Sequence, residues 1–257
     1  ESSGISLFTY LIKNISSICP IILIMGNHDY KQENSDEVDL ISSLINNSNY
    51  KNIYYLQKTG VYQYNNILFG MVSLLDTLEK GDTSGVTKDL INFPNINDYN
   101  IKNINKFIKI GLYHGLITND KKLLTKFGIS VNWFGDYDYI LLGDNHNMQI
   151  NNIKTEDNNN LTFNNLLSKY DKRYKLNEKI NEELPIWAYS GSMIQQNFGE
   201  NIYNHGYLLW DFKNKIIKPI ILFNKYCFIQ IDFEKENINS NNIINIGIKK
   251  TLSNSEI

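Results

Sequence analysis

The 257-residue sequence lacks features that would place it in several broad classes of protein. Two cysteines, Cys19 and Cys227, are too few for a disulfide framework, and we expect reduced thiols in the core of an intracellular protein. No run of about 18 apolar residues is present, as a membrane-spanning helix needs, and no secretory signal pattern opens the chain. With 25 basic and 27 acidic side chains, the protein has no net basic charge for binding nucleic acid. A polyanionic substrate would need metal ions or local clusters.

Histidine is also scarce, yet three of the four histidines come directly after short hydrophobic runs. The motifs that end these runs are Gly26-Asn27-His28-Asp29, His114-Gly115 and Gly143-Asp144-Asn145-His146. Short apolar runs of this kind are typical of strands buried on both faces. If the three strands lie side by side and parallel, the following loops meet at one sheet edge, where α/β proteins bind ligands. Because imidazole, amide and carboxylate groups bind first-row divalent metals, the motifs predict a metal site.

The rest of the pattern predicts one α/β domain followed by the start of another unit. An amphipathic helix packed for a core is expected at 5–15 with no strand before it, and Ser35 is expected to cap a helix that runs to about Asn46. Further segments are a polar surface insertion at 149–183 and strands at 53–56, 61–64, 67–75, 186–189, 207–212 and 216–223. We therefore predict a domain at 1–225 and the beginning of a C-terminal capping domain or tail at 226–257.

The three histidine motifs, in this order and rough spacing, resemble the later blocks of the calcineurin-like metallophosphoesterase superfamily. Further along, Tyr189-Ser190-Gly191-Ser192, Phe198-Gly199-Glu200 and His205-Gly206-Tyr207-Leu208-Leu209 resemble the segment that closes this domain in SbcD-type DNA repair exonucleases. The resemblance covers roughly 5–233 and implies a layered α/β/β/α sandwich. The first two blocks of the family, Asp-x-His and Gly-Asp, have no counterpart before Gly26. We therefore expect the first strand-helix-strand unit of the sandwich to be missing.

The resemblance implies the metal ligands. Asn27 and His114 would bind one divalent cation, with Asp144 in the place of a third ligand, and His146 would bind a second cation. The family usually has histidine where Asp144 stands. A carboxylate there either binds the cation, favouring a hard ion, or supports a neighbouring ligand. Two ions are implied, Mn²⁺ first, with Mg²⁺ or another first-row metal as alternatives.

The catalytic roles are implied in the same way. His28 would stand over the scissile phosphate and stabilise the transition state or protonate the leaving oxygen, while Asp29 would orient the His28 imidazole. No substrate-binding residue is assigned. The implied reaction is in-line hydrolysis of a DNA phosphodiester, exonucleolytic or endonucleolytic, by metal-activated water in DNA repair or recombination. Without the first two blocks, chain 1–257 alone is expected to show little nuclease activity.

The implied partners are DNA and an SbcC-like ATPase of the SMC type. The chain has no Gly-x-x-x-x-Gly-Lys-[Ser/Thr] loop, so ATP hydrolysis would come from a separate chain. A homodimer is left open, and no membrane partner is expected. Two other functions also stay open. One is a general metallophosphoesterase acting on nucleotides or phosphoproteins, and the other is a non-catalytic DNA-end or ATPase-binding subunit.

Several residues have plainer interpretations than a function. His205 is expected at the surface or at a strand end. Ser190 to Ser192 predict a tight backbone turn and not a nucleophile, since no suitable elbow or triad spacing surrounds them. The three tryptophans are expected in the core, and Lys172-Arg173 on a solvated face. Gln195-Gln196-Asn197 are further candidates for contact with substrate.

Overall fold

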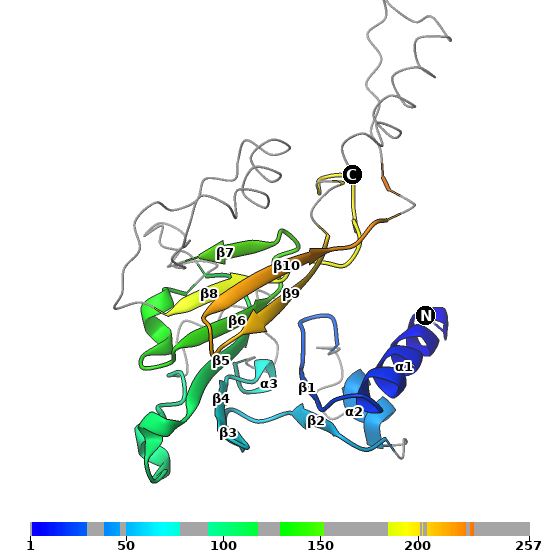
Figure 1. Cartoon of the computed structure of the whole chain (residues 1–257). Helices are drawn as coiled ribbons and strands as arrows, with labels where there is room; N and C mark the ends of the chain where they lie inside the picture. The colour runs from blue at the N-terminus through cyan, green and yellow to red at the C-terminus, as the bar shows by residue number, and fades with distance from the viewer. Residues whose placement is uncertain are drawn as a thin grey trace, which may run out of the picture.

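The computed structural model describes residues 2–29, 39–46, 50–77, 92–117, 129–151, 185–200, 202, 205–224 and 227–228. Its helices are α1 (Ser2–Ser16), α2 (Leu40–Asn46), α3 (Leu74–Thr77), and the short 3₁₀ helices η1 (Ile96–Tyr99), η2 (Ile104–Lys106) and η3 (Val131–Phe134). Its strands are β1 (Ile21–Ile24), β2 (Ile53–Leu56), β3 (Gly60–Tyr64), β4 (Ile67–Met71), β5 (Ile108–His114), β6 (Tyr139–Gly143), β7 (Gln149–Asn151), β8 (Ile186–Tyr189), β9 (Gly206–Asp211) and β10 (Ile216–Ile221) (Figure 1). The predicted mixed α/β class is confirmed. No helix among these residues has the length and apolar character needed to cross a bilayer.

A six-stranded sheet forms the centre of the fold, in the order β3-β4-β5-β6-β8-β7. The pairs β4-β5, β5-β6 and β6-β8 are parallel, and the two outer strands are antiparallel to their neighbours. The predicted parallel neighbours β5 and β6 are therefore confirmed. The predicted polar insertion was wrong at its start, because residues 149–151 form β7 and pair with β8. Residues 152–184 lie outside the described part of the chain, and so does the predicted Lys172-Arg173 face.

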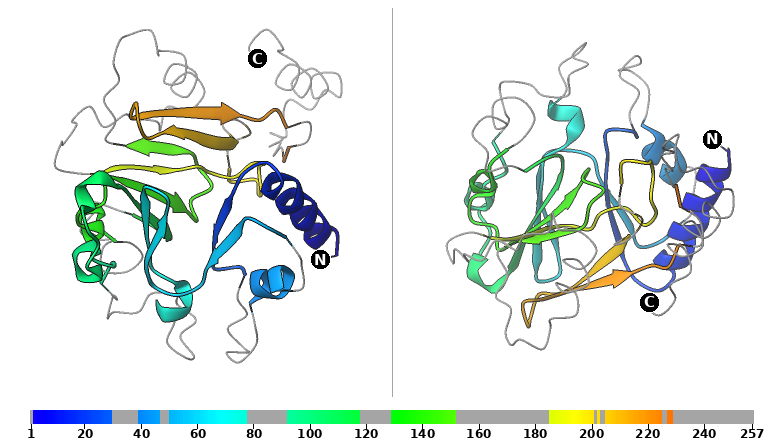
Figure 2. Two further views of the ribbon diagram at one scale, coloured as in Figure 1. Left: turned by 60° about the horizontal axis from the view of Figure 1, so that its bottom comes forward. Right: turned by 90° about the horizontal axis from the view of Figure 1, so that it is seen from above.

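Two smaller sheets cover one face of the central sheet. β1 and β2 form a parallel pair, and β9 and β10 form an antiparallel pair. The prediction that β1 shares a sheet with β5 and β6 was wrong, because β1 hydrogen-bonds to β2 instead. Its four residues are half-buried and not buried on both faces. The β1-β2 pair lies between the central sheet and helices α1 and α2 (Figure 2).

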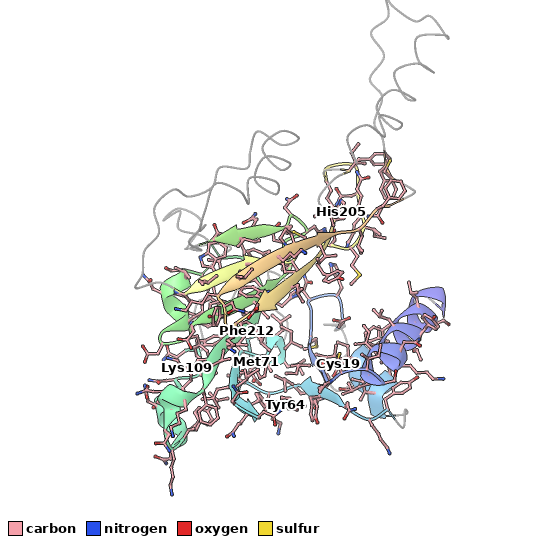
Figure 3. All side chains as sticks on the ribbon, viewed as in Figure 1. Cys19, Tyr64, Met71, Lys109, His205 and Phe212 are labelled. Carbon is pink, nitrogen blue, oxygen red and sulfur yellow. The ribbon has the colours of Figure 1, made fainter. Side chains whose placement is uncertain are left out.

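Each face of the central sheet has its own hydrophobic cluster. On one side, η1 and η3 bring Ile96, Val131 and Phe134 onto the sheet, where they meet Phe93 and Ile140. The cluster on the other side lies between the central sheet and the two smaller sheets, where Met71 and Phe212 are among its members (Figure 3). The structure thus has two β layers with helical elements outside both. Burial of apolar surface in these two clusters holds the layers together.

The N-terminal helix forms as predicted but packs less than predicted. Of its apolar residues, Ile12 is buried, whereas Ile5, Leu11 and Ile15 are exposed. At α2, Asp39 accepts hydrogen bonds from the backbone N–H and hydroxyl of Ser42, as an N-cap residue does. The predicted cap, Ser35, lies outside the described residues.

Two local predictions have different outcomes. The tight turn at Asn65-Asn66 is confirmed: Tyr64 pairs with Ile67, and Asn65 has a φ of 52°. The predicted core position of the cysteines was wrong, because Cys19 and Cys227 are free thiols but exposed. Cys19 follows α1 in the bend before β1 (Figure 3).

Gly70 offers a test of this packing. A Cβ atom there would lie 1.9 Å from the hydroxyl of buried Tyr137, which donates a hydrogen bond to the Pro94 carbonyl. Gly70→Ala should therefore lower the free energy of unfolding by about 1–3 kcal/mol, as overpacking a core does. The matched control is Gly60→Ala on the paired strand, where the nearest atom would be 3.6 Å away. Urea unfolding should show little change for the control, and equal losses for both variants would contradict the packing.

Candidate metal centre

The loops that follow β1, β5 and β6 meet at one end of the central sheet, although β1 belongs to a different sheet. His114 is the last residue of β5 and pairs with Gly143 of β6. Its Nε2 atom lies 3.1 Å from Oδ1 of Asn27 and 3.6 Å from Oδ1 of Asp144. The structure therefore brings together the three residues expected at one metal.

Two glycines make room for the His114 imidazole. A Cβ atom on Gly143 would lie 2.7 Å from Nδ1 of His114, and one on Gly26 would lie 3.0 Å from Cε1. Both distances are shorter than ordinary contacts of a Cβ atom, so larger residues would displace the ring. The glycine that opens the first motif and the glycine that opens the third thus hold the histidine of the second.

Asp144 has an unusual backbone conformation with a φ of 88°. Non-glycine residues rarely adopt positive φ, and such strain costs about 1–3 kcal/mol and gathers at functional sites. In the adjacent loop, the side chain of Asn145 accepts a hydrogen bond from the Asn147 N–H, and no residue of 143–147 other than Asp144 has a positive φ. The strain is therefore confined to the residue whose carboxylate faces His114.

Four predicted site residues lie close enough to His114 to change its pKa: His28, Asp29, Asp144 and His146. Burial lowers the pKa of His114, the carboxylates of Asp144 and Asp29 partly oppose this, and the nearby His28 and His146 side chains add a smaller lowering. A lowered pKa keeps the imidazole neutral near pH 7. Neutral imidazole has a lone pair with which it can bind a metal.

His146 is held by a residue that the sequence did not single out for this role. Its Nδ1 lies 2.7 Å from Oε1 of Glu200. In the sequence, Glu200 belongs to the motif Phe198-Gly199-Glu200, which resembles the closing segment of SbcD-type nucleases. This motif is the signal from which a role for Glu200 near the site could have been predicted. Residues of the 144–147 loop and of the 197–200 segment line an open hollow of about 610 Å³: Leu116, Asp144, Asn145, His146, Asn147, Asn197, Gly199 and Glu200.

The two predicted catalytic residues lie in the loop after β1. His28 is exposed, and close enough to His114 to affect its pKa. The Asp29 carboxylate accepts a hydrogen bond from the Gly26 N–H at 2.9 Å, which closes the turn on itself. The contact by which Asp29 would orient His28 stays a prediction.

The donor atoms around His114 suit one divalent cation. With metal–ligand bonds of about 2.1 Å, neighbouring ligands lie about 3.0 Å apart in octahedral geometry and about 3.4 Å apart in tetrahedral geometry. The two distances measured from His114 Nε2 are close to these values. In the described part of the chain, no group of three or more His, Cys, Asp or Glu side chains could hold a metal, so the first cation would have two ligands of these types, His114 and Asp144, together with the Asn27 amide. The second cation has one candidate ligand here, His146.

The other predictions concern residues next to the site. The turn at Ser190 to Ser192 is confirmed: Gly191 has a φ of 73°, and a Cβ there would lie 2.9 Å from the His146 carbonyl oxygen. His205 directly precedes β9 as predicted, but it is buried and not at the surface. Buried Gln195 bonds to the backbone of Phe228 and Glu200, which gives this side chain a structural role.

The tryptophans pack as predicted. Trp133 and Trp187 lie against the cluster on one face of the central sheet, and Trp210 lies against the cluster on the other. Base stacking therefore finds no support in their placement.

Comparisons with known proteins give one relative without a known function. The chain is 34% identical over 238 residues to an uncharacterized protein of Acanthamoeba polyphaga mimivirus, across 88% of this chain. It spans 14% of the length of that protein. No family model matches the chain, and no solved structure matches it.

Asp144 offers a test of the site with two independent measurements. Asp144→Ala and Asp144→Gly both remove the carboxylate, so both should weaken Mn²⁺ binding, measured by electron paramagnetic resonance, by at least about tenfold. Only glycine relaxes the positive φ. Metal-free Asp144→Gly should therefore be more stable to urea than Asp144→Ala by about 1 kcal/mol.

The control is Asp138→Asn, which changes an exposed carboxylate paired with Lys109 at 3.5 Å. Unchanged Mn²⁺ affinity in both Asp144 variants would show that this carboxylate is not a ligand. Equal stability of the alanine and glycine variants would contradict the strained backbone.

Proposed function

We propose that the protein hydrolyses phosphodiester bonds in DNA with divalent cations, as SbcD-type nucleases do. The observation that carries the proposal is the meeting of Asn27, His114 and Asp144 at distances that suit one cation. His28 and His146 lie at the same place, within electrostatic reach of His114. Two β layers with helical elements outside both also fit an α/β/β/α metallophosphoesterase sandwich.

The chain's own residues would divide the work as follows. Bound divalent cations supply charge that polarises a phosphoryl oxygen and lowers the pKa of water. Asn27, His114 and Asp144 would hold one cation, and the close contact of His114 with two glycines would fix its ring. His28 is exposed next to this group, so its imidazole can reach a phosphate and donate a proton to the leaving oxygen. Mn²⁺ or Mg²⁺ suits the two oxygen ligands.

The choice of DNA as substrate rests on the closing segment. The resemblance to SbcD-type nucleases lies in 189–209, and this segment directly contacts the site. Ser192 donates a backbone hydrogen bond to the His146 carbonyl, and Glu200 contacts the His146 ring. The segment that suggests DNA is therefore part of the candidate centre. An SbcC-like ATPase remains the proposed partner.

The activity should be measured on the natural polypeptide that contains this chain, at its full length. With Mn²⁺ we expect release of nucleotides from end-labelled DNA. His28→Ala should lower the cleavage rate by about 10²–10⁴-fold, the usual contribution of a general acid, and leave Mn²⁺ affinity unchanged. Asp138→Asn is the control and should cleave at the wild-type rate.

The same assay separates the other functions. Cleavage of a small phosphodiester, bis(p-nitrophenyl) phosphate, without cleavage of DNA would point to a general phosphoesterase. Metal-independent DNA binding without cleavage of either substrate would overturn the proposal in favour of a non-catalytic subunit.

The presence of aspartate at position 144 favours the non-catalytic subunit, because the metallophosphoesterase family that the chain resembles usually has histidine there. Asp144→His tests this in the same full-length protein, and histidine tolerates positive φ better than most residues. If the wild-type protein is an active nuclease, the variant should not exceed its turnover. A gain of turnover from an inactive wild type would show that the natural chain has lost its catalytic site.

A further inference from the structure

We propose that Glu200 is a positioning residue that sets the tautomer and orientation of His146, so that Nε2 of His146 is available to a metal. This inference rests on the proposed metal-dependent function. Glu200 would act through His146 and would not itself touch metal or substrate.

The Glu200 carboxylate is nearly buried, with 8% of its side chain exposed, and it sits among hydrogen-bond donors. Oε2 accepts from the backbone N–H of Gln196 at 2.8 Å, and Oε1 accepts from Nδ2 of Asn197 at 2.6 Å. The third contact is Nδ1 of His146 at 2.7 Å. A carboxylate removed from water needs such donors. Two of them come from its own turn, and the third comes from the candidate centre.

This contact decides which ring nitrogen of His146 carries the proton. A carboxylate only accepts hydrogen bonds, so Nδ1 must be the protonated nitrogen at this contact. In the neutral ring, Nε2 then keeps its lone pair. Carboxylate groups hold metal-binding histidines in this way in many proteins, and losing one usually costs 10–100-fold in metal affinity. The His146 side chain is 40% exposed, so the rest of the ring is open to the solvent-filled hollow that it lines.

A purely structural role makes a different prediction. Glu200 also closes the 196–200 turn, so its removal will loosen this turn whatever His146 does. A turn-closing residue alone would leave the tautomer of His146 as it is in water, where Nε2–H is the commoner form. The tautomer therefore distinguishes the two roles, and stability does not.

The experiment is ¹⁵N and ¹³C NMR of histidine-labelled protein, metal-free, at a pH where the imidazole is neutral. His146→Gln identifies the His146 signals. We expect the Nδ1–H tautomer in the wild type and in Glu200→Gln, whose amide oxygen still accepts the hydrogen bond, but mainly Nε2–H in Glu200→Ala. The control Asn197→Ala removes another contact of Glu200 and should keep the Nδ1–H form.

Mn²⁺ is then added as a paramagnetic probe. The Mn²⁺ concentration that broadens the His146 signal by half should rise about 10–100-fold in Glu200→Ala and stay unchanged in Asn197→Ala. Broadening of His114 together with an Nε2–H tautomer for wild-type His146 would overturn the inference and leave the proposed function standing. If His146 has the Nδ1–H tautomer but Mn²⁺ broadens neither histidine, the contact with Glu200 is supported. The metal site, and with it the role of Glu200 in metal binding, would then be overturned.

Discussion

The close fit of the His114 imidazole between Gly26 and Gly143 is the constraint on which the candidate centre depends. The ring lies where a side chain on either glycine would have to be. It can therefore sit at the junction of two layers and face Asn27 from one and Asp144 from the other. The strained backbone of Asp144, with its positive φ, lies next to this ring. Strain of this size persists where surrounding packing determines the conformation, and here the packing is that of His114 against β6.

The convergence of the three loops does not require the three strands to share a sheet. β1 pairs with β2 in the second layer, and Ile22 and Ile24 pack on the cluster that covers the central sheet. Because β1 lies against β5, its loop reaches His114 across the layer interface. A site formed between two packed layers depends on hydrophobic packing as much as on strand pairing. Its geometry is therefore tied to the stability of the core.

Sequence patterns predicted the positions of most strands, because these follow from local rules. The meeting of the motifs was predicted from three adjacent parallel strands, whereas only β5 and β6 are adjacent. Apolar runs that end at glycine and polar residues show where β5 and β6 stop. The sheet to which β1 belongs could not be read in this way, since a four-residue apolar strand fits a buried or a half-buried place equally well. The exposure of Cys19 and the burial of His205 were missed for a similar reason. Both depend on which distant segments pack nearby, and residue type does not reveal this.

The segment that begins at Tyr189 also supports the site, although its sequence motifs did not reveal these contacts. Tyr189, at the end of β8, donates a hydrogen bond from its hydroxyl to the Gly115 carbonyl and accepts one from the Ile117 N–H, next to His114. Burial raises the pKa of this phenol, so the hydroxyl keeps its proton and can donate. Ser192 and Glu200, a few residues later, bind the backbone and ring of His146. One segment thus holds His146 and the backbone that follows His114, although the two histidines come from different strands. A site held from outside its own loops can keep its shape while those loops stay open to solvent.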